Sequence, residues 1–203
     1  MGTEEYPGNA GMKDQVLVLK WVKEYISHFG GDPNKVTLMG HSAGGYAIAL
    51  HMISPLSQNY FHQAILMSGA FAPQIKFSDN QIYLAKRQAL LLGCEIKSND
   101  DVINCLKSAD PLKMVENMYA MFEYGRDNPI ILWSPVVEKD FEQNERFLIE
   151  EPRKSWENGK FNNISTIIGI TTDELMWSAV GEKCDLSIEN KRENINMHFP
   201  LQN

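Results

Sequence analysis

The chain has 203 residues, of which 43% are hydrophobic and 22% charged, the balance of a globular domain large enough to bury a real core. Its net charge of −7, without any run of basic residues, argues against nucleic acid as a partner. No apolar stretch approaches the roughly 18 residues that span a bilayer, and the first residues lack the apolar region of a signal peptide.

Strand candidates alternate with helical patterns along the chain. Apolar residues repeat at three- and four-residue steps through residues 13–29, which predicts a helix that ends at Gly30. Residues 36–39 predict a buried strand, and a helical run follows from Ala47 to Ser54. Further strands are predicted for residues 64–67 and 164–170, and residues 129–137 are apolar and β-prone. This alternation predicts an α/β architecture, a mostly parallel sheet with covering helices.

Further helix signals lie between the predicted strands, from residue 78 to residue 160. They are a helical pattern over residues 78–92, a capping box of Ser98 and Asp101, the pair Asp110-Pro111, and a short helical run over residues 152–160. We expect a helix at each of these places.

One serine stands between small residues at the junction of a predicted strand and a predicted helix. The pattern Gly40-x-Ser42-x-Gly44 is typical of a nucleophile elbow, a strained turn that exposes the serine hydroxyl. Glycines without a Cβ let the neighbouring backbone pack against such a turn. The N–H of Ala43, at the start of the helix, can then donate to an oxyanion. The alternative is a glycine-rich turn in an ordinary α/β domain.

Ordered sequence blocks surround this serine. They are Tyr6-Pro7-Gly8-Asn9-Ala10-Gly11-Met12-Lys13-Asp14-Gln15, Phe29-Gly30-Gly31-Asp32-Pro33-Asn34, Gly40-His41-Ser42-Ala43-Gly44-Gly45, and Phe61-His62-Gln63-Ala64-Ile65 running into Ser68-Gly69. As an ordered set they resemble the type-B carboxylesterase and cholinesterase family, and His41, where many members carry Glu, is similar to the insect carboxylesterases. The resemblance implies a partial α/β-hydrolase fold. Residues 1–203 would then be the central part of one such domain, truncated at both ends.

The family resemblance also implies an acidic partner for the serine. Hydrolysis through serine needs a base, an acid that orients the base, and oxyanion donors. In α/β-hydrolases the acid and then the histidine follow the serine along the chain. The resemblance implies Glu174 as this acid, although Leu175 stands where the family usually has Gly. Asp173 is the alternative acid, and a solvated carboxylate at a helix start is the alternative role for Glu174.

None of the five histidines fits the role of the base. They are His28, His41, His51, His62 and His198. His41 adjoins Ser42, but neighbours across a strained turn point apart, so we expect it to be structural. His198 follows Glu174 too closely for the family's catalytic histidine, and we expect the other three to be packing residues. The base and the upstream oxyanion loop are therefore expected to be absent from these 203 residues.

The resemblance further implies substrate-pocket walls from Phe71, Ile131 and Trp133, whereas an ordinary core strand is the alternative for residues 129–137. It also implies a disulfide between Cys94 and Cys105, the alternative being two buried thiols in a reducing compartment.

Asn163-Ile164-Ser165 is a glycosylation sequon just before a predicted strand. Together with the cysteine pair it favours a secreted protein, with Cys184 free.

Metal and cofactor motifs are absent from the sequence: there is no Cys-x-x-Cys, no His-x-x-x-His and no Gly-x-Gly-x-x-Gly. We therefore predict neither a metal nor a cofactor. The leading interpretation is a serine carboxylesterase that hydrolyses a small-molecule ester through an acyl-enzyme. The main alternative is a non-catalytic cholinesterase-like adhesion protein, although such proteins usually lose the serine. A lipase or peptidase that shares only the fold is disfavoured by the ordered blocks. The sequence does not indicate the oligomeric state.

Overall fold

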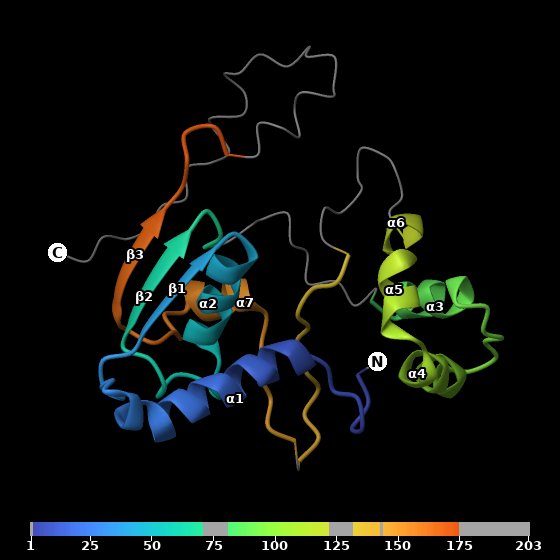
Figure 1. The fold of residues 1–203 in the computed structure, drawn as a ribbon, viewed down its shortest axis with the longest axis horizontal. Helices are drawn as coiled ribbons and strands as arrows, with labels where there is room; N and C mark the ends of the chain where they lie inside the picture. Colours follow the sequence, from blue (N-terminus) through green and yellow to red (C-terminus); the bar gives the residue numbers. More distant parts are fainter. Residues whose placement is uncertain (1, 71–80, 122–131, 143, 175–203) are drawn as a thin grey trace. The chain divides into compact units, whose positions relative to one another are not determined.

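A computed structural model of the chain describes residues 2–70, 81–121, 132–142 and 144–174 (Figure 1). The chain divides into two units, Met1–Gly169 and Ile170–Asn203. All of the helices and strands below belong to the first unit. Of the second unit, residues 170–174 are described.

The first unit is built on a parallel sheet. In the described residues, the strands β1 (Thr37–His41), β2 (Gln63–Met67) and β3 (Ser165–Gly169) pair in the order β1-β2-β3. The register aligns His41 with Met67 and Met67 with Gly169, so all three strands end at one edge. The predicted parallel sheet is confirmed, and the three strands coincide with the apolar stretches at residues 36–39, 64–67 and 164–170.

One face of the sheet carries the core. Helix α2 (Ala43–Ile53) packs on β1 and β2, and α1 (Ala10–Tyr25) and α7 (Pro152–Glu157) pack beside it (Figure 1). Two groups of buried side chains fill this layer. They are Leu19, Ile48, Ala49, Met52, Phe61, Ala64 and Leu66 around β1 and β2, and Met12, Val16, Tyr46, Leu50, Ile53, Phe147 and Leu148 between α1 and α2.

The opposite face of the sheet presents apolar side chains to solvent. Met39, Ile65 and Ile167 stand in register across the three strands. Side chains alternate along a strand, and Ala64 belongs to the core, so this row points away from α2. Met39 is 68% exposed and Ile167 66% exposed. The described part of the chain therefore leaves one apolar sheet face exposed.

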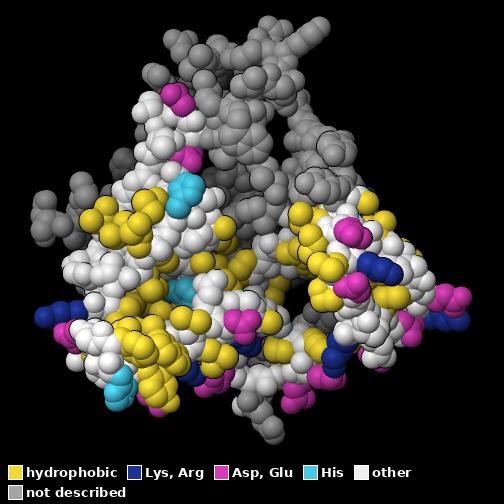
Figure 2. Space-filling view, viewed as in Figure 1, with side chains coloured by type: hydrophobic (Ala, Val, Ile, Leu, Met, Phe, Trp, Pro, Cys, Tyr) yellow, Lys and Arg dark blue, Asp and Glu magenta, His cyan; other side chains and the backbone are white. Residues whose placement is uncertain are grey.

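The first predicted helix is split in two. Helix α1 is followed by a 3₁₀ turn, η1 (Ile26–Phe29), which Gly30 ends with a left-handed φ of 80°. The apolar repeat correctly indicates a helix here. Phe29 is 71% exposed, however, so the apolar face of the predicted helix is only partly buried. Trp21 lies 5.7 Å from Tyr25 and 5.8 Å from Phe29, measured between ring centroids. Figure 2 shows hydrophobic side chains gathered at the surface over α1.

A helical part follows β2 in the sequence. It contains α3 (Gln81–Leu91), α4 (Asn99–Ser108), α5 (Pro111–Glu116) and α6 (Met118–Met121), with Ala85, Ala89, Val102 and Cys105 in its small core. The predicted capping box of Ser98 and Asp101 is confirmed, and Asp110 caps α5. Cys94 and Cys105 form a disulfide with their Cα atoms 6.3 Å apart. Across the described helices, none combines the length and the apolar composition that a membrane span requires.

The core strand that is one interpretation of residues 129–137 is not formed in the part that the structure describes, residues 132–137. The backbone N–H of Val136 donates to the Asn9 side-chain oxygen over 2.8 Å, and the Asn9 amide donates to the Val136 carbonyl over 2.7 Å. A side-chain amide therefore takes the backbone hydrogen bonds that a neighbouring strand would supply. Pro135 also has no N–H to contribute to a ladder.

Candidate active site

Ser42 occupies a strained position between β1 and α2. It is the residue that precedes α2. Its φ of 53° with ψ of −118° lies in a backbone region that residues other than glycine rarely adopt. Its N–H donates to the Met67 carbonyl over 2.8 Å, and its carbonyl accepts from the Tyr46 N–H over 3.0 Å. The residue is exposed, and its hydroxyl does not cap the helix. The local geometry is therefore that of a strand, a sharp turn with an exposed serine, and a helix.

The glycines of the motif have unequal roles in this turn. A Cβ on Gly40 would lie 2.4 Å from the Gly44 carbonyl carbon, so the turn closes only without a side chain at residue 40. A Cβ on Gly44 would meet nothing within 4 Å among the described residues. The packing explanation from the sequence therefore holds for Gly40 and not for Gly44. Gly69 is the glycine that the motif misses, because a Cβ there would lie 1.9 Å from the Ser42 carbonyl oxygen.

Ala43 begins helix α2 and is exposed beside the serine. The first N–H groups of a helix have no partner inside the helix, and they carry the positive end of its dipole. The first turn of α2 contains no acidic side chain that would compete for them. An oxygen that acquires negative charge next to Ser42 would therefore find a suitable donor in the Ala43 N–H.

Glu174 lies in the short stretch that follows β3. One of its carboxylate oxygens accepts hydrogen bonds from the Thr171 N–H over 3.0 Å and from the Thr171 hydroxyl over 2.6 Å. Asp173, the alternative acid, is exposed in the same turn. Ser42 belongs to the first unit and Glu174 to the second. The pairing of these two residues in one site stays a prediction.

Two of the histidines are packing residues, as predicted. His51 is buried, its Nε2 lies 2.9 Å from the Gln15 side-chain oxygen, and its ring meets Phe147 edge-on at 5.1 Å. Burial lowers the pKa of His51 to about 4, because the charged imidazolium loses its hydration there. The Nδ1 atom of His62 accepts the Val36 N–H over 3.2 Å.

The other histidines do not supply a base in the described part of the chain. His28 is exposed on η1, with its ring 6.5 Å from that of Tyr25, so the prediction of a packing role is wrong for this residue. His41 is exposed at the end of β1, and no hydrogen bond joins a described histidine to Ser42. His198 lies outside the described residues.

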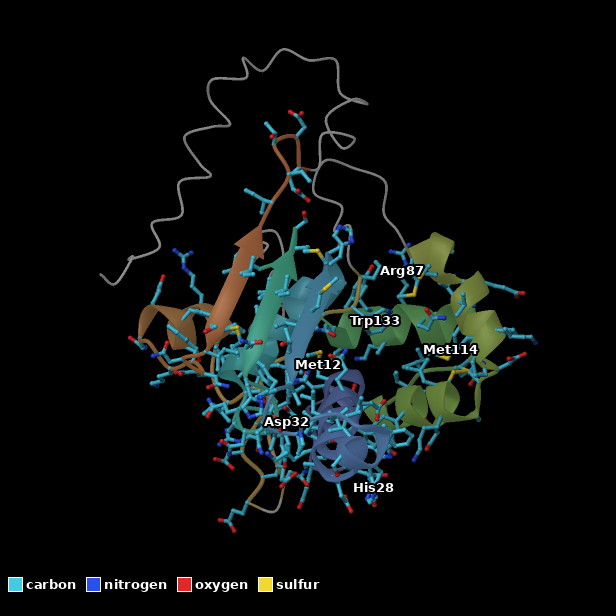
Figure 3. All side chains as sticks on the ribbon, turned by 60° about the vertical axis from the view of Figure 1, so that its left-hand side comes forward. Met12, His28, Asp32, Arg87, Met114 and Trp133 are labelled. Atoms are coloured by element: carbon cyan, nitrogen blue, oxygen red, sulfur yellow. A yellow bond between two sulfur atoms is a disulfide. The ribbon has the colours of Figure 1, made fainter. Side chains whose placement is uncertain are left out.

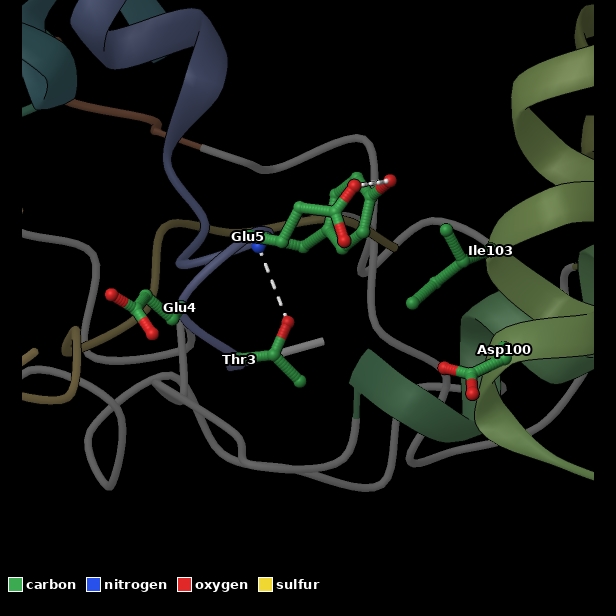
Figure 4. Close-up of a pocket in the computed structure, with 6 residues that line it drawn as sticks. Thr3, Glu4, Glu5, Asp100 and Ile103 are labelled. Carbon is green, nitrogen blue, oxygen red and sulfur yellow. Dashed lines mark hydrogen bonds between the residues drawn. The ribbon is translucent and has the colours of Figure 1, made fainter.

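Of the predicted pocket walls, Phe71 and Ile131 lie outside the described residues. Trp133, labelled in Figure 3, is 45% exposed. A different pocket, of about 390 Å³, is lined by Thr3, Glu4, Glu5, Tyr6, Asp100 and Ile103 (Figure 4). No elbow residue lines it, and three of its lining side chains are acidic, so it does not suit an apolar ester.

Two other predictions concern covalent features. The disulfide of Cys94 and Cys105 is present. Asn163 is exposed just before β3, and its glycosylation stays a prediction.

Within the described ranges, no group of three or more His, Cys, Asp or Glu side chains is placed to hold a metal ion. Cys184 lies outside those ranges.

Comparison with known proteins decides the family. Residues 1–201 match the carboxylesterase family. The chain belongs to this family. Its parallel sheet with helices is accordingly part of an α/β-hydrolase fold, as the resemblance implies.

Named relatives lie among insect esterases and cholinesterases. The chain is 34% identical over 194 residues to esterase FE4 of Myzus persicae, which covers 96% of this chain and 33% of the relative. It is 38% identical over 175 residues to the juvenile hormone esterase of Tribolium castaneum, a match that covers 83% of this chain and 29% of the relative. It is 34% identical over 186 residues to acetylcholinesterase 1 of Caenorhabditis elegans, a match that covers 87% of this chain and 28% of the relative. The chain thus spans about a third of the length of these curated relatives.

Proposed function

We propose that the protein that contains this chain is a carboxylic-ester hydrolase in which Ser42 is the nucleophile. The observation that carries the proposal is the exposed Ser42 with its φ of 53°, held between β1 and α2. Such strain persists only where the surrounding structure enforces it, and it gathers at functional sites. Membership of the carboxylesterase family supports the same assignment.

The chemistry follows from this arrangement. The Ser42 oxygen attacks the ester carbonyl carbon, and its proton passes to a histidine base that lies outside the described residues. The Ala43 N–H stabilises the oxyanion of the tetrahedral intermediate. The intermediate collapses, the carbon–oxygen bond to the alcohol breaks, and the alcohol leaves with the proton. Water then hydrolyses the acyl-serine by the same steps, and Glu174 orients the histidine throughout.

The substrate is proposed as a small-molecule carboxylic ester, without a finer class. The names of the relatives point to different esters, a juvenile hormone in one case and acetylcholine in another. The protein is proposed to be secreted, which the disulfide of Cys94 and Cys105 and the exposed Asn163 of the sequon support.

Residues 1–203 are proposed to act as the central part of a longer hydrolase domain. The exposed row of Met39 and Ile167 and the exposed Trp21 and Phe29 support this, because apolar surface of this kind is normally covered. The share of about a third that the chain spans of its relatives agrees with it. By themselves, these residues are expected to hydrolyse esters far more slowly than the longer protein.

The test uses the natural full-length protein that contains these residues. A fluorophosphonate probe should label Ser42, and the protein should hydrolyse a short-chain aryl ester. Ser42→Ala should abolish both, whereas Ser27→Ala, which changes an exposed serine on η1, should leave both unchanged. Full activity in Ser42→Ala would exclude the elbow serine as the nucleophile. A folded wild-type protein that neither reacts with the probe nor hydrolyses esters would favour the non-catalytic alternative.

A further inference from the structure

The end of strand β2 holds the Ser42 peptide from two sides. The Met67 carbonyl accepts the Ser42 N–H over 2.8 Å. Two residues later, Gly69 lies directly against the Ser42 carbonyl. A Cβ built on Gly69 would be 1.9 Å from the Ser42 oxygen, 2.8 Å from the Ser42 carbonyl carbon and 3.0 Å from the Tyr46 nitrogen. A real Cβ cannot approach atoms this closely, so a side chain at residue 69 must force the Ser42 carbonyl and the backbone after β2 apart.

The displaced carbonyl belongs to a rigid group. A peptide bond is planar, so the Ser42 carbonyl and the Ala43 N–H lie in one plane and move together. The same carbonyl accepts the Tyr46 N–H over 3.0 Å, which joins it to the first turn of α2. Pushing the oxygen away from β2 therefore turns the Ala43 N–H and moves the Ser42 side chain with it. The orientation of the proposed oxyanion donor thus depends on the absence of a side chain at Gly69.

We propose that Gly69 is a positioning residue for the nucleophile elbow: it holds the peptide between Ser42 and Ala43 in the orientation that oxyanion stabilisation requires. The inference rests on the proposed function, and it concerns a residue outside the Gly40-x-Ser42-x-Gly44 pattern. Gly69 touches no reacting atom and acts through the backbone of Ser42.

Other glycines supply a graded set of variants. A Cβ on Gly45 would lie 3.2 Å from the Gly40 oxygen, 3.3 Å from the Gly69 Cα and 3.4 Å from the Met67 nitrogen. These contacts are tight but tolerable, so Gly45→Ala presses on the same interface by a few tenths of an ångström. Gly11 in α1 is exposed, and a Cβ there would meet nothing within 4 Å. Gly11→Ala is therefore the matched control for adding one methyl group to the protein.

The test measures kcat and KM for a short-chain aryl ester in the full-length protein. Gly69→Ala should lower kcat by roughly 10²–10³-fold, the loss typical of one oxyanion donor, with KM close to the wild-type value. Gly45→Ala should lower kcat less and in the same way, and Gly11→Ala should match the wild type. A trifluoromethyl ketone, which forms a tetrahedral oxyanion adduct, should lose affinity for Gly69→Ala. The corresponding alcohol, which forms no adduct, should keep its affinity.

The outcomes separate this inference from the proposed function. If Ser42→Ala keeps full activity, the proposed function fails, whatever Gly69 does. If Ser42 is required but Gly69→Ala retains wild-type kcat, the positioning role alone is overturned. Equal losses of affinity for the ketone and the alcohol would also overturn it, because a merely loosened fold would weaken both. If Gly69→Ala does not fold, Gly45→Ala decides: a lower kcat at unchanged KM supports the inference, and an unchanged kcat overturns it.

Discussion

The side-chain amide of Asn9 pairs with both backbone groups of Val136, donating to its carbonyl over 2.7 Å and accepting its N–H over 2.8 Å. The same amide donates to the carboxylate of Glu138 over 3.0 Å. Asn9 adopts a left-handed φ of 57° immediately before α1. Asn9 therefore stands at the start of α1 and anchors a segment 127 positions away in the sequence.

Asn9→Ala should lower the free energy of unfolding by about 3 kcal/mol, because two neutral hydrogen bonds and one to a carboxylate are lost together. Denaturant unfolding of the full-length protein measures the change. The matched control is Asn104→Ala, which alters an exposed asparagine on α4 and should be close to neutral. Equal stability of the two variants would show that the pairing with Val136 contributes nothing.

His51 should make the protein less stable in acid. Burial lowers the pKa of His51 from 6.5 in the unfolded chain to about 4 in the fold. Between these values the unfolded state binds the extra proton, so stability falls as the pH drops from about 6.5 to about 4. The loss amounts to about 3.5 kcal/mol at most, at about 1.4 kcal/mol for each pKa unit.

Replacing His51 tests this directly. His51→Gln cannot take up the proton, so its free energy of unfolding should depend less steeply on pH across this window than that of the wild type. Chemical unfolding at several pH values gives the two slopes. Parallel curves for the wild type and His51→Gln would contradict the prediction.

Two glycines of the elbow should respond differently to alanine. Gly40→Ala places a Cβ 2.4 Å from the Gly44 carbonyl carbon and should destabilise the fold by about 1–3 kcal/mol, as overpacking does. Gly44→Ala meets no described atom within 4 Å. Because alanine is the better helix former, it should hold or raise stability by up to about 1 kcal/mol. Thermal and denaturant unfolding measure the stability of both variants. A larger loss of stability for Gly44→Ala than for Gly40→Ala would contradict this prediction.

The disulfide of Cys94 and Cys105 should stabilise the helical part by about 2.5–3 kcal/mol through the short loop that it closes. Peptide mapping without reduction should recover the two cysteines in one linked pair. The double variant Cys94→Ala with Cys105→Ala should unfold at lower denaturant concentration than the wild type. Alkylation of both cysteines in the native protein would argue against the bridge and against a secreted location.

Glu174→Gln should slow ester hydrolysis less than Ser42→Ala does, because the acid acts through the histidine and not on the ester. By analogy with other serine hydrolases, we expect a loss of roughly 10⁴-fold in kcat, against roughly 10⁶-fold for Ser42→Ala. Asp173→Asn, in the same exposed turn, is the matched control and should retain most of the activity. If Asp173→Asn lost roughly 10⁴-fold in kcat and Glu174→Gln retained most of the activity, the orienting acid would be Asp173.

The sequence by itself determined the features that depend on neighbours a few residues apart. The strand, serine and helix around Ser42 follow from local apolar patterns and small residues. The capping box of Ser98 and Asp101 joins residues three apart, and the Asp110 cap bonds to the N–H two residues on. Interactions of such short range form in any context that allows the helix, so the residue types alone are sufficient to predict them.

Only the tertiary structure decided the features that depend on residues far apart in the chain. Residues 132–137 have an apolar strand pattern, yet the Asn9 side chain takes the backbone hydrogen bonds of Val136. The glycine that constrains the elbow most tightly is Gly69, because the parallel pairing of β1 with β2 brings it against Ser42. No local pattern encodes such a contact. It exists only once the strands have assembled in register and the backbones of the two turns have come within van der Waals distance.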